Sequence, residues 1–70
     1  MAGSWRFDIR LRPDTDTEES ATFGGDTEVE GKSLMDEWVR EHGATGDRFL
    51  WERTGPSKTG AGEWQEGRLE

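Results

Sequence analysis

The chain has 70 residues, of which 29% are hydrophobic; it carries a net charge of −7 and contains no cysteine. This length allows one small domain over residues 1–70, and the missing cysteines exclude a disulfide scaffold and a thiolate metal site. The sequence has no apolar run of membrane-spanning length and no apolar signal-peptide segment. We therefore expect a cytoplasmic protein without membrane contact.

Residues 4–12 alternate strictly between apolar and polar side chains, which is typical of a half-buried strand. Pro13 ends this strand because proline cannot donate a backbone hydrogen bond to a neighbour. The side chains expected on its buried face are Trp5, Phe7, Ile9 and Leu11.

An acidic tract follows over residues 14–30, with seven carboxylates and no basic residue. We expect residues 13–19 to form a solvated acidic loop. This tract accounts for most of the negative charge, because the remaining segments are close to neutral.

The second half of the tract predicts a weak strand. Residues 20–23 can pair back onto the first strand with Ala21 and Phe23 pointing inward. The glycines at 24 and 25 interrupt this strand, and residues 27–29 are expected to continue it as a short edge piece.

Residues 33–42 form the helix that the sequence predicts most clearly. Ser33 and Asp36 have the spacing of a capping box, and Gly43 follows as the expected end. One helical stripe carries the apolar side chains and the single histidine, namely Leu34, Met35, Trp38, Val39 and His42.

A second clear strand covers residues 47–54, with Phe49 and Trp51 on one face. Residues 55–62 are rich in glycine and are expected to form a flexible loop. Residues 63–66 are the candidate for a last short strand, and we interpret residues 69–70 as a cloning remnant.

These elements predict an α+β fold with a three- or four-stranded, mostly antiparallel sheet and the 33–42 helix packed on one face. Because a core this small is marginally stable, we expect a partner or a homo-oligomer to add stability. Phe23 and Trp64 are the aromatic residues expected to be exposed. The expected core consists of Trp5, Phe7, Ile9, Leu11, Leu34, Met35, Trp38, Val39, Phe49 and Trp51.

The leading functional hypothesis is a non-catalytic, acidic interaction module that binds a protein partner with a basic surface, as a regulator or a nucleic-acid mimic. It rests on the isolated acidic tract and on four tryptophans, a residue type enriched at binding hot spots. The residues assigned to this surface are Asp14, Asp16, Glu18, Glu19, Phe23 and Trp64.

An alternative hypothesis is contact with nucleic acid through the polar face of the first strand. Interleaved basic and aromatic residues suit single-stranded nucleic acid, although the net charge of −7 opposes phosphate binding. The residues concerned are Arg6, Arg10, Arg12 and Arg48.

A third and weaker hypothesis is a small metal-dependent enzyme. Part of the acidic tract partly matches the spacing of a calcium-binding loop, through Asp26, Glu28, Glu30 and Glu37. The long side chains at its inner positions and the missing first helix disfavour this match. No nucleophile is placed beside His42, so we expect no catalytic residues and no cofactor.

Overall fold

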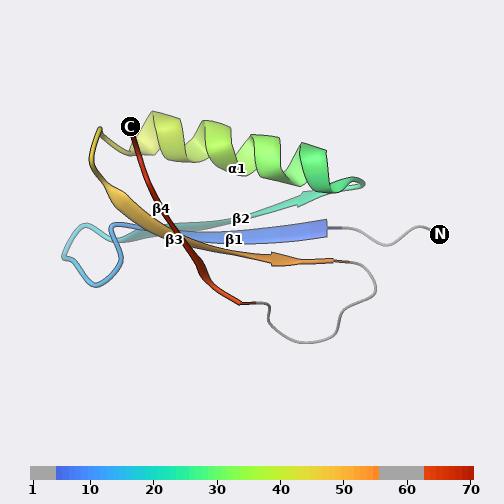
Figure 1. Ribbon diagram of the computed structural model, residues 1–70, viewed down its shortest axis with the longest axis horizontal. Helices are drawn as coiled ribbons and strands as arrows, with labels where there is room; N and C mark the ends of the chain where they lie inside the picture. The colour runs from blue at the N-terminus through green and yellow to red at the C-terminus, as the bar shows by residue number, and fades with distance from the viewer. Residues whose placement is uncertain (1–4, 56–62) are drawn as a thin grey trace.

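Four antiparallel strands form one sheet in the order β2-β1-β3-β4, and one helix crosses one of its faces (Figure 1). The computed structural model describes residues 5–55 and 63–70. The predicted α+β class is confirmed. The elements are β1 (Trp5–Leu11), β2 (Glu19–Gly25), α1 (Glu28–His42), β3 (Arg48–Thr54) and β4 (Gln65–Arg68).

The two clearly predicted strands become the central pair of the sheet. Ile9 of β1 pairs with Trp51 of β3 on one side and with Ala21 of β2 on the other. The weak strand predicted after the acidic loop therefore does pair back onto β1. Most of the loop predicted over residues 55–62 lies outside the described residues.

Helix α1 begins at Glu28, so the prediction that it begins at Ser33 is wrong. Thr27 has an extended backbone, and its side chain accepts a hydrogen bond of 3.2 Å from the backbone N–H of Glu30. Thr27 is therefore the N-cap. The predicted edge strand over residues 27–29 is also wrong, because Glu28 and Glu30 instead occupy the first turn, where the helix dipole favours acidic side chains.

The earlier start changes which helical stripe is buried. The buried positions of α1 are Gly31, Met35 and Val39. Leu34 lies off this stripe and is 47% exposed, so its assignment to the core is wrong. Phe23, expected to be exposed, is half-buried because its ring packs against Trp38.

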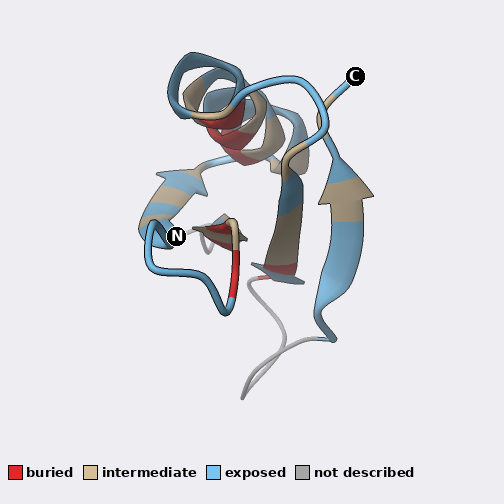
Figure 2. Cartoon of the chain, turned by 90° about the vertical axis from the view of Figure 1, so that its left-hand side faces the viewer, coloured by how far each residue is buried: buried red, intermediate tan, exposed pale blue. Residues whose placement is uncertain are grey.

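The core lies between α1 and the inner face of the sheet (Figure 2). Five apolar side chains are buried, and partly buried side chains, mostly aromatic, pack against them. The buried set is Phe7, Ile9, Leu11, Met35 and Val39. The partly buried aromatic residues are Trp5, Phe23, Trp38, Phe49 and Trp51.

Aromatic rings in this protein pack directly against glycine backbone. A methyl group on Gly31 would lie 2.6 Å from two ring carbons of Phe7, and one on Gly55 would lie 2.9 Å from the indole of Trp5. Gly67 of β4 is covered in the same way by the ring of Phe49. Each glycine is therefore required for the close approach of a ring to the backbone.

Helix α1 covers only half of the inner face of the sheet. In the described part of the chain its backbone packs against β2 and β1 but does not approach β3 or β4. Figure 2 shows the helix above β2 and β1, with β4 at the far side of the sheet. The helix is too short and too polar to cross a membrane.

The C-terminal residues complete the fold. Leu69, interpreted from the sequence as part of a cloning remnant, packs against the core. Its backbone N–H donates to the carbonyl of Asp47, and its carbonyl accepts from the N–H of Gly46. These bonds extend the pairing of β3 and β4 beyond the strands themselves.

We predict that Gly31→Ala destabilises the protein, although alanine favours a helix by about 1 kcal/mol over glycine. Overpacking against the buried ring of Phe7 would lower the free energy of unfolding by about 1–3 kcal/mol. Urea denaturation measures this. Ser33→Ala, at an exposed helical position, is the control and would change stability by less than about 0.5 kcal/mol. A Gly31→Ala protein as stable as wild type would contradict the packing argument.

Candidate functional site

Part of the acidic tract is paired with the arginines at the end of β1. Glu18 accepts a hydrogen bond of 2.7 Å from Nε of Arg10, and Glu19 pairs with Arg12 at 2.6 Å. Asp14 lies 3.9 Å from Arg10, whereas Asp16 is exposed and forms no ion pair among the described residues. Two of the four carboxylates assigned to partner binding thus form close ion pairs within the fold.

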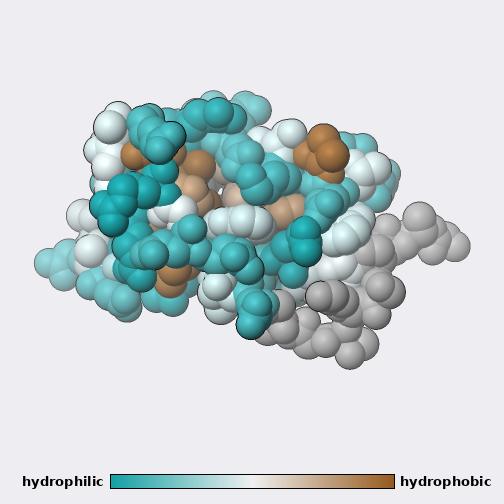
Figure 3. Space-filling view, viewed as in Figure 1, coloured by the Kyte–Doolittle hydropathy of each residue, from teal (hydrophilic) through white to brown (hydrophobic). Residues whose placement is uncertain are grey.

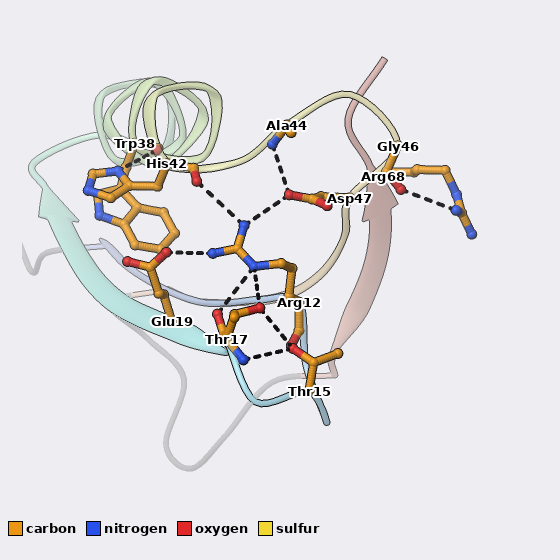
Figure 4. Close-up of polar contacts among 10 residues, drawn as sticks. All are labelled: Arg12, Thr15, Thr17, Glu19, Trp38, His42, Ala44, Gly46, Asp47 and Arg68. Carbon is orange, nitrogen blue, oxygen red and sulfur yellow. Dashed lines mark hydrogen bonds and ion pairs between the residues drawn. The ribbon is translucent and has the colours of Figure 1, made fainter.

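Arg12 joins four parts of the chain (Figure 4). Its Nε donates to the carbonyl and the hydroxyl of Thr17, and its Nη2 donates to Glu19. Its Nη1 donates to Asp47 at 2.9 Å and to the carbonyl of His42 at 3.5 Å. This single guanidinium connects the end of β1, the loop before β2, the last turn of α1 and the approach to β3.

Two carboxylates of this region have lowered pKa values. The pKa of Glu18 is lowered chiefly by its hydrogen bond from Arg10 and then by the backbone N–H of Asp14. The pKa of Asp47 is lowered chiefly by the backbone N–H of Ala44 and then by Arg12. Both shifts favour the charged form in the folded protein.

The four arginines assigned to nucleic-acid contact all have carboxylate partners. This pairing leaves none of them as an uncompensated cation for phosphate, which would have to displace a carboxylate. The ion pairs are Arg6 with Asp8, Arg10 with Glu18, Arg12 with Glu19 and Asp47, and Arg48 with Glu66.

The calcium candidates do not converge. Glu28, Glu30 and Glu37 lie on α1, and Glu28 pairs with Arg53 of β3. Across residues 5–55 and 63–70, no group of three or more His, Asp or Glu side chains is placed to hold a metal ion. Asp26 is exposed ahead of the N-cap.

His42 belongs to an aromatic stack on the β2 side of the helix. Its ring stacks on Trp38 with a centroid separation of 4.6 Å, and its Nδ1 lies 2.9 Å from the carbonyl of Trp38. The ring of Phe23 packs against the ring of Trp38 as well. The cluster packs β2 against α1, so Phe23 and His42 have structural partners of their own.

Trp64 directly precedes β4 and is 44% exposed. Phe23 and Trp64 are the aromatic residues that the sequence assigned to the partner surface, and of these two only Trp64 is exposed. Trp51, which the sequence placed in the core, is instead only partly buried.

A hollow lies between the N-terminal half of α1 and the uncovered inner face of β3. Its volume is about 340 Å³. We call it the α1–β3 hollow, and its lining residues are Phe7, Glu28, Val29, Lys32, Ser33, Trp51 and Arg53. Figure 3 shows apolar atoms in a depression between the helix and the strands below it.

Trp51 and charged side chains define this hollow. The ring of Trp51 packs on Phe7 with a centroid separation of 6.2 Å, and the ammonium of Lys32 lies 5.3 Å from the centroid of the same indole. Val29 is 73% exposed beside it. The rim cations are paired within the protein, Lys32 with Asp36 at 3.0 Å and Arg53 with Glu28.

A second hollow of about 250 Å³ lies near the C-terminal half of α1. We call it the α1–β4 hollow. Arg40 and Arg68 line it and form no ion pair within the described part of the chain. The other lining residues are Asp36, Val39, Leu69 and Glu70.

Sequence reasoning missed both hollows. Alternation places Trp51 correctly on the inner face of β3, but it does not reveal which strands the helix covers. The available signal is the glycine at position 31, because a glycine inside a helix indicates a close backbone contact and hence where the helix is seated.

Comparisons with known proteins do not assign the chain to a family or a fold. No family model matches the chain, and neither the curated proteins nor the solved structures give a significant match.

We predict that Arg12→Lys lowers the free energy of unfolding by about 1–2 kcal/mol, because lysine keeps the charge but loses the planar fork that reaches several acceptors. Arg6→Lys is the matched control, since Arg6 is more exposed and has Asp8 as its ion-pair partner. It would cost less than about 0.5 kcal/mol. Equal effects of the two variants in urea denaturation would contradict the role given to Arg12.

We predict that Asp47→Asn flattens the acid side of the stability–pH curve. Asp47 has a lowered pKa in the folded state, so its contribution is present above its ordinary value of 3.8 and is lost as pH falls through the folded value. Wild type would therefore lose more stability than the variant between about pH 4 and pH 2. Asp16→Asn, at an exposed carboxylate, is expected to leave the slope unchanged, and the same slope in wild type and Asp47→Asn would refute this account.

Proposed function

We propose that this protein is a non-catalytic binding module that holds an apolar and acidic segment of a partner protein beside α1. The observation that carries the proposal is the half-covered sheet, which leaves Trp51 partly exposed at the base of the α1–β3 hollow. The apolar face of a sheet is ordinarily covered by another element, and among residues 5–55 and 63–70 a helix packs on only half of this face.

The chemistry of the hollow supports a binding role. Its volume of about 340 Å³ is within the range of ligand pockets, and it combines an indole with exposed Val29. Tryptophan is enriched among the residues that contribute most to protein–protein affinity. Glu28, the one carboxylate lining this hollow, is paired with Arg53, so the hollow lacks the pair of carboxylates that glycosidase-type chemistry uses.

Four of the nine basic residues of the chain line the two hollows. Lys32 and Arg53 in the first hollow are paired with Asp36 and Glu28, whereas Arg40 and Arg68 in the second form no ion pair among the described residues. Arg40 and Arg68 therefore favour a carboxylate on the partner, although the protein has a net charge of −7. The effect is local, because repulsion from more distant acidic residues is screened beyond about 8 Å at physiological salt.

The acidic tract over residues 14–30 has a different part in this proposal. Glu18 and Glu19 brace β1 and the loop before β2 through Arg10 and Arg12, rather than forming the docking surface. These two carboxylates lie at β2 and the loop before it, whereas Glu28, at the end of the tract, lines the α1–β3 hollow.

We predict that Ser33→Trp abolishes binding, because Ser33 is exposed on the rim and an indole there fills the α1–β3 hollow without disturbing the core. Peptides selected from a phage-displayed random library on wild type would lose at least about tenfold in affinity on this variant, equivalent to about 1.4 kcal/mol. Fluorescence anisotropy of the labelled peptides measures the loss.

Ser20→Trp is the matched control, since it introduces the same ring on an exposed position of β2. Urea denaturation verifies that both variants fold. Selected peptides that bind wild type and Ser33→Trp equally, or a selection that yields no binder, would overturn the proposed function.

A further inference from the structure

We propose that the segment bound here is an amphipathic helix that lies alongside α1 on the uncovered half of the sheet. Its apolar side rests on Trp51, and a carboxylate at one end contacts Arg40 and Arg68. This inference rests on the proposed function and adds the conformation, the position and the charge of the occupant.

The width of the sheet gives the first argument. Adjacent strands lie about 4.8 Å apart, so four strands present a face roughly 15–19 Å wide. Packed helices lie about 8–10 Å apart, so this face has room for two helices. Among the described residues one helix lies over β2 and β1. The half over β3 and β4 has the width of a second helix, and side chains such as Lys32, Phe49 and Leu69 reach over it.

The line of the two hollows gives the second argument. Val29 and Ser33 line the first hollow, and Asp36 and Arg40 line the second, so both open on one flank of α1. Val29 and Arg40 are separated by about 16 Å along the helix axis at 1.5 Å per residue. An occupant that fills both hollows must follow α1 for about three turns.

The position of the free sheet edge argues against a strand as the occupant. β2 and β4 are the edge strands, and β4 is the edge beside the hollows, so a strand added there would pair with the outer side of β4. It would then lie farther from α1 than β4 does, outside the space between α1 and β3. A helix laid on the sheet face, by contrast, contacts Trp51 directly.

The charged residues around the two hollows determine which chemical group fits at one end of the bound helix. Lys32 and Arg53 already have partners, Asp36 and Glu28. Arg40 and Arg68 have no ion pair among the described residues, although Glu70 lines the same hollow. Asp36 also lines this hollow, and Arg68 donates to the carbonyl of Gly46 at 3.3 Å. A carboxylate of the partner helix placed in the α1–β4 hollow would add a direct ion pair to both guanidinium groups.

The test uses synthetic peptides and the indole N–H resonances of the ¹⁵N-labelled protein. The first probe is an alanine-based helical peptide of about 16 residues, with leucines at i, i+3, i+4 and i+7 and two glutamates at one end. The second has the same composition with the leucines distributed around the helix, and the third has lysines in place of the glutamates. The fourth is an extended peptide with alternating leucine and threonine.

The first probe is expected to shift the indole resonance of Trp51 and the amides of residues 29–40, while that of Trp38 stays unchanged. It would bind at least about fivefold more tightly than the lysine probe. This preference would disappear in an Arg40→Gln/Arg68→Gln variant and persist in Arg6→Gln, whose arginine lies on β1.

The outcomes separate the two proposals. If the extended peptide shifts Trp51 and the helical probe does not, or if the scrambled helix binds equally well, the helical occupant is refuted while the binding module stands. If the glutamate and lysine probes bind equally, the charge assignment is refuted. If no probe shifts Trp51, the helical occupant is refuted, and the peptide selection on Ser33→Trp decides the proposed function separately.

Discussion

The contact between the buried ring of Phe7 and the backbone of Gly31 fixes the position of the helix, and most of the surface follows from that position. The helix comes close enough to β1 only because Gly31 has no side chain, and Gly25 makes a similarly close approach from β2. With its first half held over these two strands, α1 cannot be centred on the sheet. The inner faces of β3 and β4 are therefore left without a helix.

A small core of this kind needs support outside it, and Arg12 provides much of that support. Its backbone has a φ of 52°, in a region that side chains other than glycine rarely adopt, at a cost of roughly 1–3 kcal/mol. Hydrogen bonds to Thr17, Glu19 and Asp47 hold the residue there. Thr17 and Glu19, both in the acidic tract that dominates the charge of the sequence, thus help to complete the structure around an arginine.

The parts of the fold that sequence could predict are those with a strong local period. Alternation fixed β1 and β3, and the 3.6-residue period fixed the second half of α1. The first half was missed because Gly31 breaks the apolar pattern for a reason that only the packed ring of Phe7 reveals. The two hollows could not be predicted from the sequence. They depend on the order of the strands and on where the helix packs on the sheet, and the residue pattern of a single element gives neither.

The tryptophans show that the surroundings of one residue type depend on where it lies across the sheet. Trp38 lies on the side of α1 that faces β2, and its ring packs against the rings of Phe23 and His42. Trp51 has the same inward direction, but the backbone of α1 does not approach its strand, so its ring packs on Phe7 and under the ammonium of Lys32 and is only partly buried. An inward-facing pattern therefore predicts full burial only when an element covers that strand, and on the half of the sheet without a helix the same pattern leaves the side chain only partly buried.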